Sequence, residues 1–111
     1  MLSDNSVYVA YSRSLRQLAV GYAYRLRREG REVTLPIRDV DAKGELQIFS
    51  ENLPLIEQRG ELHVLSDGTS QGLWLEVGAA LALRKKIVVV KLDRPAGFGL
   101  LEEIQANEDR H

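Results

Sequence analysis

The sequence contains no cysteine, so disulfide bonds and thiolate metal sites are excluded. Its two histidines, His63 and His111, are too few and too far apart in the sequence to suggest a zinc site. The formal net charge is only -1, which gives no reason to expect bulk attraction to nucleic acid or to an anionic membrane. No apolar run could span a bilayer, and the first residues lack the basic and apolar layout of a signal peptide. These absences favour a cytoplasmic protein whose partners are neither nucleic acid nor membrane.

What is present describes an ordinary globular domain. The chain has 111 residues, of which 44% are hydrophobic and 28% are charged. A chain of this length has the usual size of one domain with one core. We therefore expect a single domain over residues 1–111.

Short β-branched or aromatic runs alternate with segments of helical periodicity. The expected strands are Val7–Tyr11, Arg31–Ile37, Glu61–Asp67 and Lys85–Leu92, and the expected helices are residues 15–29, a second one that starts near 50–52, 72–84 and 100–106. Ser12 or Ser14 is expected to cap the first helix, and Gly30 to end it in left-handed backbone. Residues 37–47 are polar and carry Gly44, so they predict a loop. The second helix is expected to start near 50–52, because Pro54 is comfortable only in a first turn.

Four alternations of strand and helix predict a three-layer α/β fold of the flavodoxin-like (Rossmann-like) kind. Its parallel strands would have the order 2-1-3-4, with helices on both faces. In such sheets ligands bind beyond the carboxyl ends of the strands, where the strand order reverses. The two loops expected there, Tyr11–Ser14 and Ser66–Gly72, are rich in hydroxyl groups and lead into helix N-termini, which favour an anion.

The stretch GLWLEVGAALAL, residues 72–83, contains one polar side chain, Glu76. A first-turn glutamate can simply complement the helix dipole and point to solvent. Its apolar neighbours and its place beside the expected crevice favour a second interpretation, in which Glu76 lies at the boundary of a site. The helix N-terminus keeps a carboxylate ionised, as a nucleophile requires.

The segment SDGTSQGLWLEVGAALALRKKIVVV, residues 66–90, resembles the signature of the nucleoside 2-deoxyribosyltransferases and the 2′-deoxynucleoside 5′-phosphate N-hydrolases. The resemblance extends over about Val7–Leu92 and is most specific for Ser70, Gly72, Glu76 and Gly78. It implies cleavage or transfer at the N-glycosidic bond of a deoxynucleoside or its 5′-monophosphate. Because the sequence offers no ligand cluster, we expect neither a metal nor an organic cofactor. The resemblance also implies a homo-oligomer.

By this resemblance Glu76 would attack C1′ of the sugar, with Tyr8 positioning it and Asp67 lying near the sugar hydroxyls. Tyr8 could instead be a core aromatic residue, and Asp67 a turn residue paired with Gly68. Three further residues would contact the 5′ end of a nucleotide, or merely cap and turn the chain: Ser12, Ser70 and Gly72.

The sequence departs from the family pattern at two positions. The family has an aspartate that helps to protonate the leaving base where this chain, in SENLPLI, has Asn52. An amide is no general acid, so Glu51, Asp67 or water would take that role, and Asn52 could equally be an N-cap before Pro54. Tyr11 replaces a family glycine and is expected to crowd the place of a base or phosphate.

Two other functions remain open from the sequence. The first is a module of the same fold that binds a nucleotide or a sugar phosphate without turning it over. The second is a receiver-like or flavodoxin-like interaction domain, which the lack of acidic residues in VYVAYS and the short YSRS turn argue against. In every case the apolar third helix, with Trp74 as the expected anchor, favours a homodimer.

Overall fold

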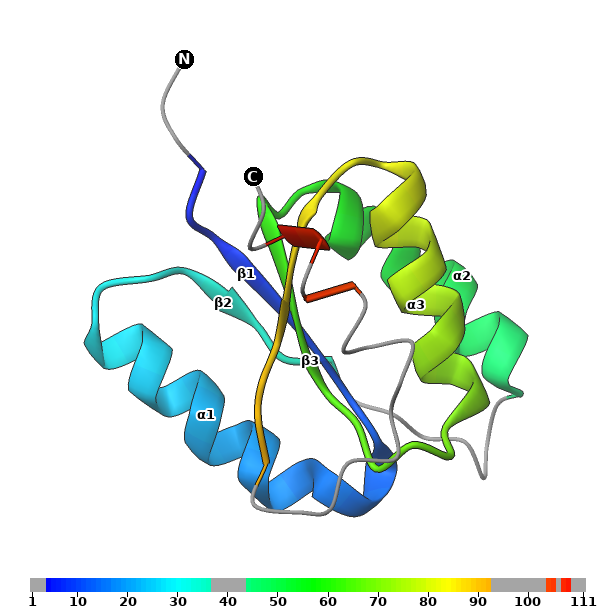
Figure 1. The fold of residues 1–111 in the computed structure, drawn as a ribbon, viewed down its shortest axis with the longest axis horizontal. Helices are drawn as coiled ribbons and strands as arrows, with labels where there is room; N and C mark the ends of the chain where they lie inside the picture. Colours follow the sequence, from blue (N-terminus) through cyan, green and yellow to red (C-terminus); the bar gives the residue numbers. More distant parts are fainter. Residues whose placement is uncertain (1–3, 37–43, 93–103, 106, 109–111) are drawn as a thin grey trace.

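A four-stranded parallel sheet forms the centre of the structure, a computed structural model that describes residues 4–36, 44–92, 104–105 and 107–108. Its strands are β1 (Val7–Tyr11), β2 (Val33–Thr34), β3 (Glu61–Leu65) and β4 (Lys86–Val89), in the order β2-β1-β3-β4. Helix α1 (Arg16–Arg28) covers one face, and helices α2 (Glu45–Glu57) and α3 (Gln71–Ala82) lie side by side on the other (Figure 1). The predicted three-layer fold and strand order are confirmed.

The side chains of β1 alternate between two cores, as the period of two in a strand requires. Tyr8 and Ala10 face α2 and α3, whereas Val7, Val9 and Tyr11 face α1. All five residues are buried, which explains why the strand is continuously apolar. Tyr11 therefore lies on the opposite face from Tyr8, where its hydroxyl donates a hydrogen bond to the carbonyl oxygen of Pro36 at 2.6 Å. The alternation thus turns the Tyr11 side chain under α1, away from the face that carries Tyr8.

The start of α1 differs from the sequence-based expectation. A short 3-10 turn, η1 (Arg13–Leu15), precedes it, and Leu15 is its N-cap without a side-chain hydrogen bond. The hydroxyls of Ser12 and Ser14, which were expected to cap the helix, bind the loop after β3 instead. The other end agrees with the sequence, since Gly30 has a φ of 89°, in the left-handed region.

Helix α2 begins at Glu45, about one and a half turns before the expected start, and holds Pro54 in its interior. The prediction assumed that proline must lie in a first turn. An interior proline removes one helical hydrogen bond, but burial of Ile48 and Ile56 against the core supplies packing that offsets this cost. Asn52 consequently lies inside the helix and is not its N-cap.

The remaining elements are shorter than predicted. Strand β2 has two residues, β3 ends at Leu65, and β4 ends at Val89. The predicted turn 93–99 and most of the predicted helix 100–106 lie outside the described residues. No helix within the described ranges is long and apolar enough to cross a membrane.

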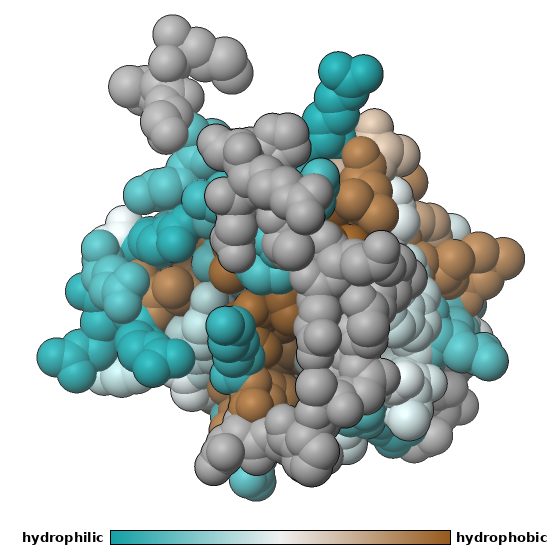
Figure 2. Space-filling view, in the orientation of Figure 1, coloured by the Kyte–Doolittle hydropathy of each residue, from teal (hydrophilic) through white to brown (hydrophobic). Residues whose placement is uncertain are grey.

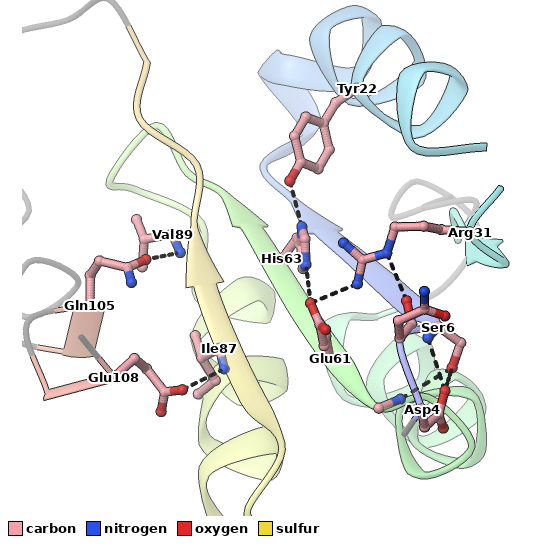
Figure 3. A network of polar contacts seen from close by, with 12 residues as sticks. Asp4, Ser6, Tyr22, Arg31, Glu61, His63, Ile87, Val89, Gln105 and Glu108 are labelled. Atoms are coloured by element: carbon pink, nitrogen blue, oxygen red, sulfur yellow. Dashed lines mark hydrogen bonds and ion pairs between the residues drawn. The ribbon is translucent and has the colours of Figure 1, made fainter. Parts of the chain in front are cut away.

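The outer edge of β4 meets side chains in place of a further strand. The amide of Val89 donates to Oε1 of Gln105 at 2.6 Å, and the amide of Ile87 donates to Oε2 of Glu108 at 3.4 Å (Figure 3). These amides are two residues apart, so both point away from β3. Gln105 and Glu108 thus satisfy backbone donors that a fifth strand would otherwise bind.

Candidate functional site

Glu76 lies on the face of α3 that packs on the sheet. Only 1% of it is exposed, and its neighbours Leu73 and Val77 belong to the core between the sheet and α2 and α3. The Tyr8 hydroxyl donates a hydrogen bond to Oε2 of Glu76 across this core. The interpretation of Glu76 as a solvated first-turn residue was therefore wrong.

Burial makes this pair energetically consequential. A carboxylate removed from water loses several kcal/mol of solvation unless hydrogen bonds replace the water. A phenol is a donor at neutral pH, so the Tyr8 hydroxyl both compensates the carboxylate and fixes its orientation. The pair joins residues 68 positions apart, because β1 and α3 meet in the same layer. The arrangement can hold an oriented carboxylate against a bound molecule.

Asp67 organises the loop at the carboxyl end of β3. Its Oδ2 accepts a hydrogen bond from the Ser14 hydroxyl at 2.6 Å, and its Oδ1 accepts from the amide and the hydroxyl of Thr69 at 2.9 and 2.8 Å. Burial raises the pKa of Asp67, but these hydrogen bonds outweigh it and lower the pKa to about 2. The Asp67 carboxylate is therefore ionised at neutral pH.

Ser12 joins the same loop to the end of β1. Its amide donates to the carbonyl oxygen of Leu65 at 2.9 Å, and its fully buried hydroxyl accepts from the Asp67 amide at 2.9 Å. Ser70 is the N-cap of α3 but makes no capping side-chain bond, and Gly72 is buried in the first turn. Thus Ser12, Asp67 and Ser70 gather at the expected strand-order reversal, while Tyr8 and Glu76 contact each other within the α2–α3 layer.

Among the residues that the structure describes, two polar side chains on one face of α2 have buried atoms without a hydrogen-bond partner. They are Nδ2 of Asn52, whose residue is 8% exposed, and Oε2 of Glu45. Asn52 shares the buried face with Ile48 and Ile56, and Ile56 packs in the same core as Tyr8. An unsatisfied buried donor or acceptor costs about 1–3 kcal/mol, so each is a group that a bound molecule could satisfy.

Sequence reasoning missed Glu45, because residues 37–47 were assigned to a loop. The spacing of Glu45, Ile48, Asn52 and Ile56 at three- and four-residue intervals was the available signal. Glu51, one of the suggested replacements for the missing acid, is exposed and accepts a hydrogen bond from Nε2 of Gln47 at 3.2 Å. Asp67, the other, holds no proton to donate at neutral pH.

A second buried polar cluster lies beneath α1, on the opposite face of the sheet (Figure 3). Nδ1 of His63 is hydrogen-bonded to the Tyr22 hydroxyl, and Nε2 lies 2.8 Å from Oε1 of Glu61, which also binds Arg31 at 2.8 Å. Burial lowers the pKa of His63, although Glu61 opposes the shift. The neutral ring therefore accepts from Tyr22 and donates to Glu61. The alternation in ELHVL, which places Glu61 and His63 on one face, could have predicted this cluster.

Within the parts of the chain that the structure describes, no three histidine, aspartate or glutamate side chains gather to hold a metal ion. Comparison with protein-family models gave no match to this chain, and comparison with curated proteins gave none. The observations that bear on function are the Tyr8–Glu76 pair and the polar groups around it.

Proposed function

We propose that the protein cleaves or transfers at the N-glycosidic bond of a deoxynucleoside or its 5′-monophosphate, with Glu76 as the nucleophile. The observation that carries this proposal is the buried hydrogen bond from the Tyr8 hydroxyl to Glu76. Burial of a carboxylate is costly, and a packed helix face would ordinarily carry an apolar residue at this position. The resemblance of residues 66–90 to the deoxyribosyltransferases and N-hydrolases supports the same reading.

The reaction proceeds in two displacements at one carbon. A carboxylate oxygen of Glu76 bonds to C1′ as the C1′–N bond breaks, and the electron pair leaves with the base, which takes a proton from water. Water or a second base then attacks C1′, and the ester bond returns its electron pair to Glu76. Water gives up one proton to solvent as it attacks, and a second base likewise gives up the proton of its attacking nitrogen. This is the sequence of a retaining glycosidase.

Tyr8 and Asn52 are positioning residues in this scheme. The Tyr8 hydroxyl holds the carboxylate in one orientation before and after attack. The amide of Asn52 offers a buried N–H donor for an acceptor atom on the base. Because Glu76 is 1% exposed, a substrate must displace neighbouring side chains to reach it.

A second candidate function is binding of a nucleoside or nucleotide without turnover. The observation that favours it is that two residues expected to protonate the leaving base, at positions 52 and 67, cannot do so. Asn52 carries an amide, and the Asp67 carboxylate is already ionised at neutral pH, so neither protonates a leaving base.

Replacing Glu76 by glutamine separates these functions. We expect base release from deoxynucleosides or their monophosphates, followed by chromatography, to fall by at least a thousandfold, because an amide forms no glycosyl ester. Folding should persist, since the glutamine carbonyl can still accept from Tyr8. Tyr8→Phe should reduce turnover less, because Glu76 keeps its carboxylate and loses only the bond that orients and compensates it.

Glu51→Gln is the matched control, because Glu51 is an exposed glutamate on α2. It should release base at the wild-type rate. Binding without base release by the wild type would establish the second candidate, and neither binding nor release would contradict both.

A further inference from the structure

The end of the sheet at which a nucleotide would place its 5′-phosphate already holds an anion. This anion is the Asp67 carboxylate, which spans from the loop after β3 to the turn after β1. Three donors converge on it: the Ser14 hydroxyl, the Thr69 amide and the Thr69 hydroxyl, at 2.6–2.9 Å. Backbone amides and hydroxyls of this kind, in a loop that leads into a helix N-terminus, are the groups that usually bind a phosphate.

We infer that the site takes nucleosides with a free 5′-hydroxyl and selects against their 5′-monophosphates, because the Asp67 carboxylate already engages the Ser14 and Thr69 donors and places a negative charge beside the N-terminus of α3. This inference rests on the proposed function and narrows its substrate class. Ser12 strengthens it, since the Ser12 hydroxyl is fully buried and accepts from the Asp67 amide rather than facing a ligand.

The expected preference for the nucleoside over its 5′-monophosphate comes mainly from electrostatic repulsion. A phosphate monoester carries a charge of about -1.5 to -2 at neutral pH, and it would have to approach an ionised carboxylate that already uses the shared donors. The nearest cations along the chain, Arg13 and Arg16, are exposed, and solvent and salt screen their attraction for a phosphate as they screen the repulsion from the partly exposed Asp67. Asp67 differs from them because its carboxylate is fixed among the donors of the loop. A neutral 5′-hydroxyl meets no such repulsion and can donate to a carboxylate oxygen.

The test compares a 2′-deoxynucleoside with its 5′-monophosphate in the wild type and in Asp67→Asn. We expect the wild type to favour the nucleoside in kcat/KM by about tenfold or more, the effect of one close like-charge contact. Asparagine keeps the size of the side chain and an acceptor for Thr69, but it removes the charge. The variant should therefore lose most of this preference by gaining activity on the monophosphate.

Asp4→Asn is the matched control. Asp4 also accepts from a nearby serine, through the amide and the hydroxyl of Ser6 at 2.9 and 2.5 Å, but it precedes β1 at the other end of the sheet. Its replacement should leave the ratio between the two substrates unchanged.

Calorimetry also measures the affinity of each protein for the nucleoside and for its 5′-monophosphate. The inference can then be decided even if no base is released. Equal or better turnover of the monophosphate by the wild type would overturn the inference while leaving the proposed function standing. If no base is released, the proposed catalysis fails, and binding decides the inference: tighter binding of the nucleoside, lost in Asp67→Asn, supports it. Tighter binding of the monophosphate, equal binding, or no binding of either overturns it.

Discussion

Single side chains account for the two polar clusters buried on opposite faces of the sheet. On the α2–α3 face the Tyr8 phenol compensates Glu76, and on the α1 face His63 links Tyr22 to Glu61. Both clusters depend on strand alternation, since neighbouring residues of β1 and β3 point to different cores. They are therefore physically separate, and a change in one should leave the chemistry of the other intact.

His63 should make folding stability depend on pH. Its pKa lies below the ordinary value of 6.5 in the folded chain, so the unfolded chain binds the proton more readily. The contribution of His63 to the free energy of unfolding is therefore complete above about pH 7.5 and is lost as pH falls through 6.5 toward the folded pKa. Urea titrations at pH 8, 7, 6 and 5 measure this decline.

The decline between pH 7 and 5 should shrink in His63→Gln. Tyr22→Phe is the control, because it keeps the titrating ring buried beneath α1 and should retain a slope. The carboxyl groups of Asp4, Glu61 and Asp67 have lowered pKa values and titrate below this window. Equal slopes in the wild type and His63→Gln would show that His63 is not the responsible group.

Secondary-structure elements show where sequence reasoning succeeded. The strand order could be predicted because short connections, right-handed crossovers and two buried faces leave few topologies for four βα units. The start of α2 was missed, because tertiary burial of Ile48, Asn52 and Ile56 overrides the local penalty of Pro54. The two hydroxyl-rich loops meet at the carboxyl ends of β1 and β3, but the partners of their hydroxyls depend on contacts between residues more than 50 positions apart, such as Ser12 and Asp67. No local pattern encodes such contacts.

Gly60, the residue before β3, packs against the segment that precedes β1. We expect that this position does not tolerate a side chain. A Cβ there would lie 2.1 Å from the carbonyl oxygen of Asp4, which is backbone and has to shift. Gly60 and Glu61 also donate their amides to Ser6. We expect Gly60→Ala to lower the free energy of unfolding by about 1–3 kcal/mol in urea titration.

Gly21→Ala is the matched substitution. Gly21 lies inside α1, where an added Cβ meets nothing within 4 Å, so alanine should raise the free energy of unfolding by up to ~1 kcal/mol. Opposite signs at the two glycines would confirm that the close approach to Asp4, rather than the loss of glycine itself, decides the outcome. A neutral Gly60→Ala would contradict it.

The molecule as a whole exposes an apolar strip on its two-helix side. Figure 2 shows brown, hydrophobic surface over the layer of α2 and α3. On α3, Leu75 is 40% exposed and shares a stripe with Gly78, Ala79 and Ala82, none of which carries a polar side chain. Trp74, the expected anchor, packs partly buried against the core of its own chain. The stripe that begins at Leu75 is thus the better candidate for contact with another molecule.

We propose that two copies of the chain associate through this stripe. A two-fold contact between α3 helices would bury Leu75 on both copies, and Gly78 would allow the helices to approach closely. Sedimentation velocity at micromolar concentration should show a dimer that Leu75→Glu converts to a monomer. Leu18→Glu is the control, because Leu18 is 54% exposed on α1 across the sheet, and it should remain dimeric. A monomeric wild type would contradict the proposal.

The side-chain acceptors on β4 bear on what happens when many copies meet at high concentration. An apolar outer strand is a template onto which another extended chain can add, and repeated addition is how fibrils grow. At Ile87 and Val89 the donors of this template are engaged by Gln105 and Glu108. A side chain accepts a hydrogen bond but presents no further strand for the next chain to copy. At these two residues the growth of the sheet is terminated from within the same polypeptide.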